Sequence, residues 1–233
     1  MAYTDSQVMM TLAAITYAPA EDIRSYLLPT TNPPNATNGE WALVWGPAVT
    51  ATDKGNLMFV SYNGSRNQYA IAIRGTYPYF SLALFVDLYQ DLDVNHPRPW
   101  QYPTVDGALV AGGTIDGLND LLALTSDGVA FHTFVESKIA PGGADIFVTG
   151  HSLGGALTTV LAPWLAYRLS QINAKNAVVP YTFAGPTAGN AEFASFYTGL
   201  FKNSYRYYNS IDIVPKAWAD LLSIKSLYSS PGR

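Results

Sequence analysis

The stretch IFVTGHSLGG, residues 146–155, decides the fold of this chain. Its β-branched and aromatic start predicts a short strand, and Ala156–Ala162 predicts a helix soon after it. Between them lies Gly150–Gly154, a G-x-S-x-G pattern centred on Ser152. In this context the pattern predicts a nucleophile elbow, because small neighbours let strand and helix approach closely and lift the serine hydroxyl out of the sheet. The backbone N–H of Leu153 then lies at a helix N-terminus, where it stabilises developing negative charge.

The composition of the whole chain narrows the class of protein. Its 233 residues fit a single domain, 1–233, and 13% are charged, with a net charge of −4. A chain without a basic stripe is no nucleic-acid binder, and one without an apolar run of about 18 residues has no transmembrane segment. Cysteine is absent, so disulfides and cysteine metal sites are excluded. The sequence contains no phosphate loop, nucleotide fingerprint or His/carboxylate metal cluster, so we expect no cofactor and assign no metal-binding residues; a structural calcium stays open.

Hydrophobic periodicity outward from the elbow predicts an α/β fold. Strands at Leu57–Tyr62 and Gln68–Arg74 form a hairpin around Asn63-Gly64, and strands and helices alternate afterwards. The expected architecture is a central mixed, mostly parallel sheet flanked by helices. The further expected elements are helices at Val8–Ile15, Asp116–Leu124, Asp127–Ile139 and from Asn190 to Phe201, and strands at Trp41–Trp45, Val178–Phe183 and Tyr205–Asn209.

Four segments resemble those of class 3 lipases, the fungal-type triacylglycerol lipases, in the same order along the chain. They are Ala72–Thr76 (oxyanion strand), Val148–Leu157 (nucleophile), Tyr181–Asn190 (the strand and turn after the nucleophile helix) and Asn209–Pro215 (aspartate loop). The resemblance covers about Leu57 to Pro215. It implies an α/β-hydrolase-like fold and hydrolysis of acylglycerol esters through an acyl-enzyme intermediate.

The resemblance and the residues together assign a role to each candidate site residue. Ser152 is the nucleophile, and Leu153 and Thr76 hold the oxyanion; Thr76 is carried over from the family motif. Asp212 follows the last strand, where functional groups gather at the carboxyl edge of a sheet, and would orient a histidine base. Two alternatives stay open: Asp212 as a turn residue before Val214-Pro215, and Asp220 as the orienting carboxylate.

The apolar stretch directly after Thr76 is a lid in the family. Its large side chains would cover the acyl site in water and contact a lipid interface when open. A buried helix is the alternative interpretation. The residues assigned to lid and substrate binding are Tyr77, Phe80, Leu82, Leu84 and Phe85.

The sequence has no histidine at the place where the family has its catalytic base. The chain has His96, His132 and His151, and none follows Asp212, whereas the family's histidine lies well beyond its aspartate. His151 should point away from Ser152, and His132 falls within a predicted helix, which leaves His96 as an alternative. The preferred interpretation is a C-terminally incomplete lipase whose missing segment carries the histidine. The absence of cysteine favours a bacterial type. No basic signal region begins the chain, and the compartment, secreted or cytoplasmic, stays open.

Two rival functions follow from these features. Phospholipase A1 and feruloyl-type esterases have similar motifs, and either would act on a different ester. A catalytically inactive domain that binds lipid or a partner through residues 77–85 would explain the missing histidine. Against this second rival stands the elbow itself, since a binding domain has no need of a strained serine turn.

Overall fold

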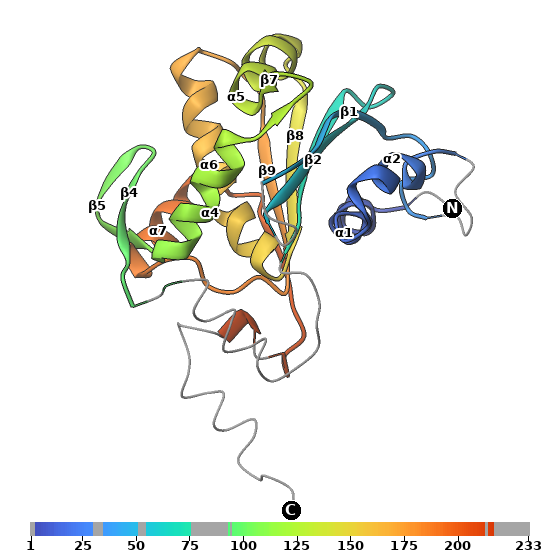
Figure 1. Cartoon of the computed structure of the whole chain (residues 1–233). Helices are drawn as coiled ribbons and strands as arrows, with labels where there is room; N and C mark the ends of the chain where they lie inside the picture. The colour runs from blue at the N-terminus through green and yellow to red at the C-terminus, as the bar shows by residue number, and fades with distance from the viewer. Residues whose placement is uncertain are drawn as a thin grey trace, which may run out of the picture.

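A computed structural model describes residues 3–29, 35–50, 55–75, 93, 95–212 and 214–216. Its centre is a six-stranded sheet with the order β1-β2-β3-β8-β9-β10 (Figure 1). β1, β2 and β3 are antiparallel, whereas β3, β8, β9 and β10 run parallel to one another. The expectation of a mixed, mostly parallel sheet flanked by helices is therefore confirmed.

The elements have the following bounds. The strands of the central sheet are β1 (Ala42–Val49), β2 (Leu57–Asn63), β3 (Gln68–Ile73), β8 (Asp145–His151), β9 (Val178–Phe183) and β10 (Tyr205–Tyr207). Two small hairpins lie outside it: β4 (Arg98–Gln101) with β5 (Thr104–Val110), and β6 (Thr125–Ser126) with β7 (Val129–Ala130). The α-helices are α1 (Asp5–Ile15), α2 (Ile23–Tyr26), α4 (Gly112–Ala123), α5 (Phe131–Phe134), α6 (Leu153–Gln171) and α7 (Ala191–Leu200).

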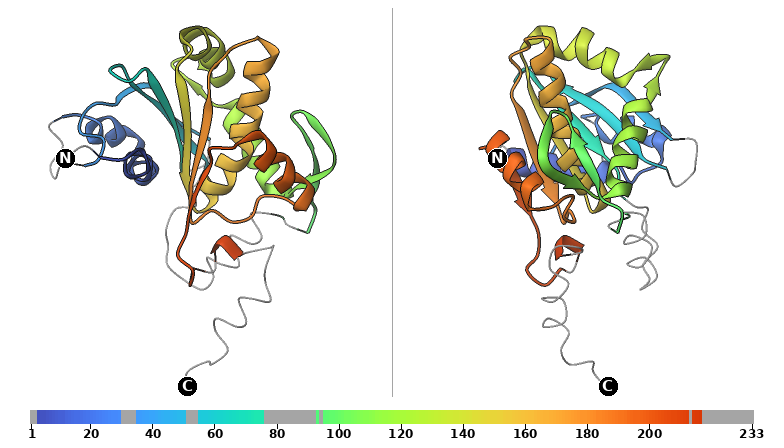
Figure 2. Two further views of the ribbon diagram at one scale, coloured as in Figure 1. Left: turned by 180° about the vertical axis from the view of Figure 1, so that it is seen from behind. Right: turned by 90° about the vertical axis from the view of Figure 1, so that its left-hand side faces the viewer.

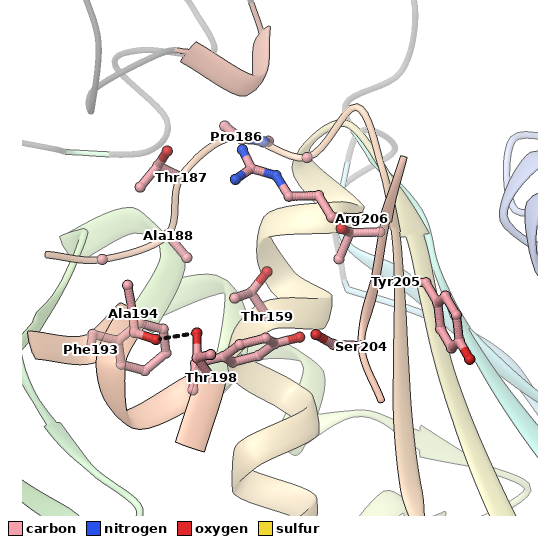
Figure 3. Close-up of a pocket in the computed structure, with 14 residues that line it drawn as sticks. Thr159, Pro186, Thr187, Ala188, Phe193, Ala194, Thr198, Ser204, Tyr205 and Arg206 are labelled. Carbon is pink, nitrogen blue, oxygen red and sulfur yellow. Dashed lines mark hydrogen bonds between the residues drawn. The ribbon is translucent and has the colours of Figure 1, made fainter. Parts of the chain in front are cut away.

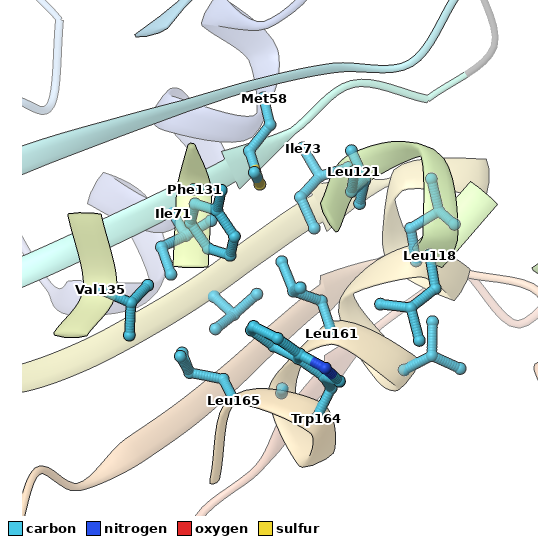
Figure 4. Close-up of a cluster of buried hydrophobic side chains, with 14 of the residues drawn as sticks. Met58, Ile71, Ile73, Leu118, Leu121, Phe131, Val135, Leu161, Trp164 and Leu165 are labelled. Carbon is cyan, nitrogen blue, oxygen red and sulfur yellow. The ribbon is translucent and has the colours of Figure 1, made fainter. Parts of the chain in front are cut away.

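Helices cover both faces of the sheet. α1 and α2 lie on one face, and α4, α6 and α7 lie on the other (Figures 1 and 2). The period-2 alternation of the strands divides the core accordingly. Ile71 and Ile73 pack with the α4–α6 side (Figure 4), while the intervening Ala72 packs with α1. Each central strand is thus buried on both faces, which explains its nearly continuous apolar sequence.

The parallel strands bring their carboxyl ends to one edge of the sheet. In register, Ile73 of β3 lies opposite Gly150 of β8, and His151 lies opposite Phe183 of β9. The short helical turn Val214–Lys216 lies at the same end of the molecule (Figures 1 and 2). This edge therefore gathers residues from all four segments that resemble lipase motifs.

The helix at the N-terminus begins earlier than the predicted Val8. α1 begins at Asp5, and the capping residue is Thr4, whose hydroxyl accepts a hydrogen bond from the Gln7 N–H while the Gln7 side chain accepts one from the Thr4 N–H. This reciprocal pair is a capping box, and it fixes the first turn of the helix. The predicted cap of α7 is confirmed, because the Asn190 side chain accepts a hydrogen bond from the Phe193 N–H.

One predicted helix is divided into several elements. Residues 127–139 form the turn and second strand of the β6–β7 hairpin, then α5, then a π-helical turn, Val135–Ile139. Asp127 and Gly128 have φ of 50° and 76°, the left-handed pair that a tight hairpin turn requires. The apolar spacing of Phe131, Phe134 and Val135 was interpreted correctly, but the Asp-Gly turn signal before it was missed.

Candidate active site

Ser152 lies at a sharp turn between β8 and α6. Its backbone has φ of 56° and ψ of −125°, a strained conformation for a residue with a side chain. Its N–H donates to the Phe183 carbonyl at 2.9 Å, which fixes the turn against β9. This is the geometry of a nucleophile elbow, and strand β8, turn and helix α6 follow one another as the sequence predicts.

The glycines around Ser152 are required by close backbone contacts. A Cβ on Gly150 would overlap the Gly154 carbonyl, and one on Gly154 would overlap the Ile73 carbonyl. A Cβ on Gly155 would lie 2.7 Å from the Gly185 Cα in the loop after β9. The start of α6 therefore packs directly on the ends of β3 and β9, and side chains at these positions would push it away.

Gly154→Ala should destabilise the protein strongly, by about 3 kcal/mol or more, because the backbone that its Cβ meets cannot move aside as a flexible side chain would. The matched control is Gly199→Ala in α7, where an added Cβ meets no atom within 4 Å. In a helix that change should stabilise by roughly 0.5–1 kcal/mol. Urea unfolding of both variants measures the difference; equal stabilities would refute the close packing at the elbow.

The first turn of α6 supplies a candidate oxyanion donor. Among the described residues, no acceptor takes a hydrogen bond from the Leu153 N–H. The amide therefore remains available at the positive end of a 19-residue helix, beside the Ser152 hydroxyl. Thr76, the second predicted donor, lies outside the described residues, as do Tyr77, Phe80, Leu82, Leu84 and Phe85.

Asp212 lies near the elbow, in a turn that follows β10. Its Oδ1 accepts a hydrogen bond from the Val214 N–H at 3.0 Å, and its N–H donates to the Asn209 carbonyl at 2.9 Å. Burial lowers the pKa of the His151 imidazole, and the negative charge of Asp212 partly offsets that effect. The Asp212 side chain thus forms the turn before Val214 that was the structural alternative to a catalytic role. Its charge also acts on His151, the residue before Ser152. Asp220 lies outside the described residues.

None of the three histidines hydrogen-bonds the Ser152 hydroxyl, and neither does any other described residue. His96 is largely exposed, and its Nδ1 contacts Asp93 Oδ1 at 2.7 Å. His132 is exposed at the start of α5. His151 directs its Nδ1 to the hydroxyl of Tyr17 at 3.0 Å, in agreement with the expectation that it points away from Ser152. Sequence reasoning missed Tyr17, because it lies far from every motif.

Burial lowers the pKa of His151, and the opposing effect of Asp212 only partly offsets this. A histidine with a lowered pKa in the folded state binds protons more readily in the unfolded chain. Its contribution to the free energy of unfolding is therefore complete above about pH 6.5, the pKa in the unfolded chain. That contribution is lost as the pH falls toward the lower pKa of the folded state. The melting temperature should therefore fall more steeply between pH 7.5 and 5.5 in the wild type than in His151→Gln. Parallel profiles would contradict the lowered pKa.

A cavity of about 250 Å³ lies beside the edge strand β10. Phe193, Ala194 and Thr198 of α7 face Thr159 of α6 across it, with Arg206 of β10 near its other end (Figure 3). The Arg206 guanidinium donates to the Pro215 carbonyl at 3.1 Å. Neither Ser152 nor Asp212 lines this cavity, so it is separate from the elbow.

In the part of the chain that the structure describes, no group of three or more His, Asp or Glu side chains is arranged to hold a metal ion. None of the helices seen there is long and apolar enough to cross a bilayer.

Known proteins that are similar in sequence to this chain are lipases. Residues 70–221 match the family model described as Lipase (class 3). A lipase of Caenorhabditis elegans is 44% identical over 71 residues, which are 30% of this chain and 20% of that protein. A lipase of Rhizomucor miehei is 33% identical over 121 residues, 50% of this chain and 31% of that protein. The matches thus span between a fifth and a third of these two relatives.

Solved structures resemble this chain over more of its length. The M37 lipase superposes with a TM-score of 0.85 at 32% identity, and the match covers 98% of this chain and 74% of that one. Lipase II from Rhizopus niveus superposes with a TM-score of 0.67 at 20% identity, covering 96% and 75% of the two chains, and at that identity it shows the fold alone.

Proposed function

Because this chain belongs to the class 3 lipase family, we propose that it hydrolyses carboxylic ester bonds of acylglycerols through a serine acyl-enzyme. The observation that carries the proposal is the backbone of Ser152, strained at φ 56° between β8 and α6. Such strain persists at functional sites because the surrounding structure enforces it, and here tight glycine contacts enforce it. The fold alone would require no serine with positive φ at this place.

Each residue has a role in the proposed reaction. The Ser152 oxygen attacks the ester carbonyl carbon, and its proton passes to a base that then gives it to the departing alcohol. The Leu153 N–H, together with Thr76, stabilises the oxyanion of the tetrahedral intermediate. Asp212 orients the base and stabilises its positive charge. Water then attacks the acyl-enzyme by the same route and releases the fatty acid.

The base in this mechanism is an imidazole between Ser152 and Asp212. No described histidine contacts the Ser152 hydroxyl, and Asp212 Oδ2 has no hydrogen bond to a described residue. Free imidazole is small enough to act in such a position. Activity assays are therefore best run both with and without added imidazole.

Residues 77–85 form the lid in this proposal. The stretch follows Thr76 directly, and Tyr77, Phe80, Leu82, Leu84 and Phe85 give it an apolar face suited to a lipid interface. Opening of such a segment would expose the acyl site and bind the enzyme peripherally to its substrate aggregate.

A chain-length series tests the substrate class. Triacylglycerols with acyl chains of about four to eighteen carbons should be hydrolysed. For the short-chain substrates, which dissolve in water at low concentration, the rate should rise when the substrate passes from solution to emulsion. Higher activity on phospholipid or on feruloyl esters than on triacylglycerol would favour one of the other esterases. Binding to emulsions without hydrolysis of any ester, even with added imidazole, would favour an inactive lipid-binding domain.

A further inference from the structure

The hydroxyl of Tyr17 lies directly behind the elbow. Tyr17 follows α1 and is 134 positions before His151, yet its hydroxyl is 3.0 Å from His151 Nδ1 and 3.3 Å from the His151 carbonyl oxygen. The two rings meet edge to face, with centroids 5.8 Å apart. Since His151 is bonded directly to Ser152, the hydroxyl holds both the side chain and the backbone of the residue that precedes the nucleophile.

The same hydroxyl contacts the end of the neighbouring strand. A Cβ added to Gly75 would overlap both the Tyr17 hydroxyl and the His151 carbonyl, so the three groups form one tight contact. The backbone amide of Gly75 also favours the ionised form of Tyr17, whose pKa burial nevertheless raises to about 12. Gly75 immediately precedes Thr76, the proposed second oxyanion donor.

One arrangement of protons allows both hydrogen bonds between Tyr17 and His151 to form at once. A protonated Tyr17 donates to the His151 carbonyl and accepts from a neutral His151 ring that carries its proton on Nδ1. The high pKa of Tyr17 and the lowered pKa of His151 both favour these neutral forms. The cluster therefore keeps its hydrogen bonds fixed over a wide pH range, as a positioning device requires.

The helix that precedes Tyr17, α1, is packed on the sheet. The Thr149 hydroxyl, buried in β8, donates to the Met9 carbonyl at 3.0 Å, and Asp5 pairs with Arg66 at 2.7 Å. Met9 and Leu12 of α1 are fully buried. α1 and Tyr17 both lie before residue 70, where the match to the family model begins.

We propose that Tyr17 is a positioning residue for the ester hydrolysis, fixing the elbow at His151 to the strand end at Gly75 and so setting Ser152 and the Leu153 N–H in place. This inference rests on the proposed function. Tyr17 touches neither Ser152 nor the ester; it acts through His151 and Gly75. Tyr17, in the segment after α1, is accordingly part of the catalytic scaffold.

Butylboronic acid tests the inference, because its boron binds the Ser152 oxygen and forms a tetrahedral anion that resembles the intermediate. Tyr17→Phe should weaken boronate binding between about 10- and 100-fold, the range expected when a site is displaced by a fraction of an ångström to an ångström. The matched control is Thr149→Val, which removes one buried hydrogen bond between the same helix and sheet but leaves the elbow untouched. It should lower the melting temperature and leave boronate affinity at the wild-type value.

A second substitution, at His151, removes the same hydrogen bond between the Tyr17 hydroxyl and the His151 ring. His151→Leu should weaken boronate binding as Tyr17→Phe does, and combining the two should add little, because both remove one interaction. The boronate affinity of His151→Leu still tests the inference if Tyr17→Phe does not fold. Wild-type affinity in either single variant, or an equal loss in Thr149→Val, would overturn the positioning role. No boronate binding to the wild type, or equal binding to Ser152→Ala, would instead overturn the proposed function and this inference with it.

Discussion

Replacing Ser152 with alanine should reduce ester hydrolysis to the uncatalysed rate. Loss of the nucleophile in a complete serine triad lowers turnover on the order of 10⁶-fold, since nothing else can form the acyl-enzyme. The measurement is release of p-nitrophenol from p-nitrophenyl butyrate, with and without added imidazole, because no described histidine contacts the Ser152 hydroxyl. The rate without enzyme is subtracted in each case, since imidazole itself cleaves such esters.

The control for this variant is Ser170→Ala, in the last turn of the same helix. The Ser170 hydroxyl donates to the Tyr167 carbonyl at 2.6 Å and is exposed, far along α6 from the elbow. Turnover should be unchanged. Equal activity of Ser152→Ala and the wild type would show that hydrolysis occurs elsewhere and would exclude Ser152 as the nucleophile.

Asp212→Asn should give the second largest loss, on the order of 10⁴ in turnover where a histidine base is in place. Asparagine has the same shape, and its Oδ1 can still accept the Val214 N–H that now bonds Asp212. The substitution therefore removes the charge and leaves the turn, so it separates the catalytic interpretation from the structural one.

Turnover and melting temperature measured together decide between these interpretations of Asp212. A large loss of turnover with little change in melting temperature supports the orienting role. Unchanged turnover would reduce Asp212 to a turn residue. Asp106→Asn serves as control, because Asp106 is an exposed carboxylate on the β4–β5 hairpin and its substitution should alter neither quantity.

Much of the fold was predictable from local patterns. The bounds of β9, Val178–Phe183, agree with the prediction to the residue, because β-branched and aromatic residues occupy every position in it except Pro180. The elbow was predictable for a different reason: its glycines are dictated by backbone contacts, and so they appear in the sequence at fixed spacing. The strand before the elbow and the helix after it, β8 and α6, were also predicted correctly.

What could not be predicted depends on contacts between distant segments. The Tyr17–His151 hydrogen bond joins residues 134 positions apart, and nothing in the local sequence of Tyr17 distinguishes it from the other 15 tyrosines. The β6–β7 hairpin was mistaken for helix because its strands are two residues long, too short for alternation to be visible. In both places tertiary packing decides the outcome.

Labelling with a fluorophosphonate, followed by peptide mass spectrometry, tests most directly whether the elbow presents a reactive serine. In that reaction the serine oxygen bonds phosphorus and fluoride leaves. We predict one phosphonyl group per chain, on the peptide that contains Ser152, with labelling accelerated by added imidazole. Labelling at another residue, or none in the presence of imidazole, would contradict the assignment of Ser152 as the nucleophile.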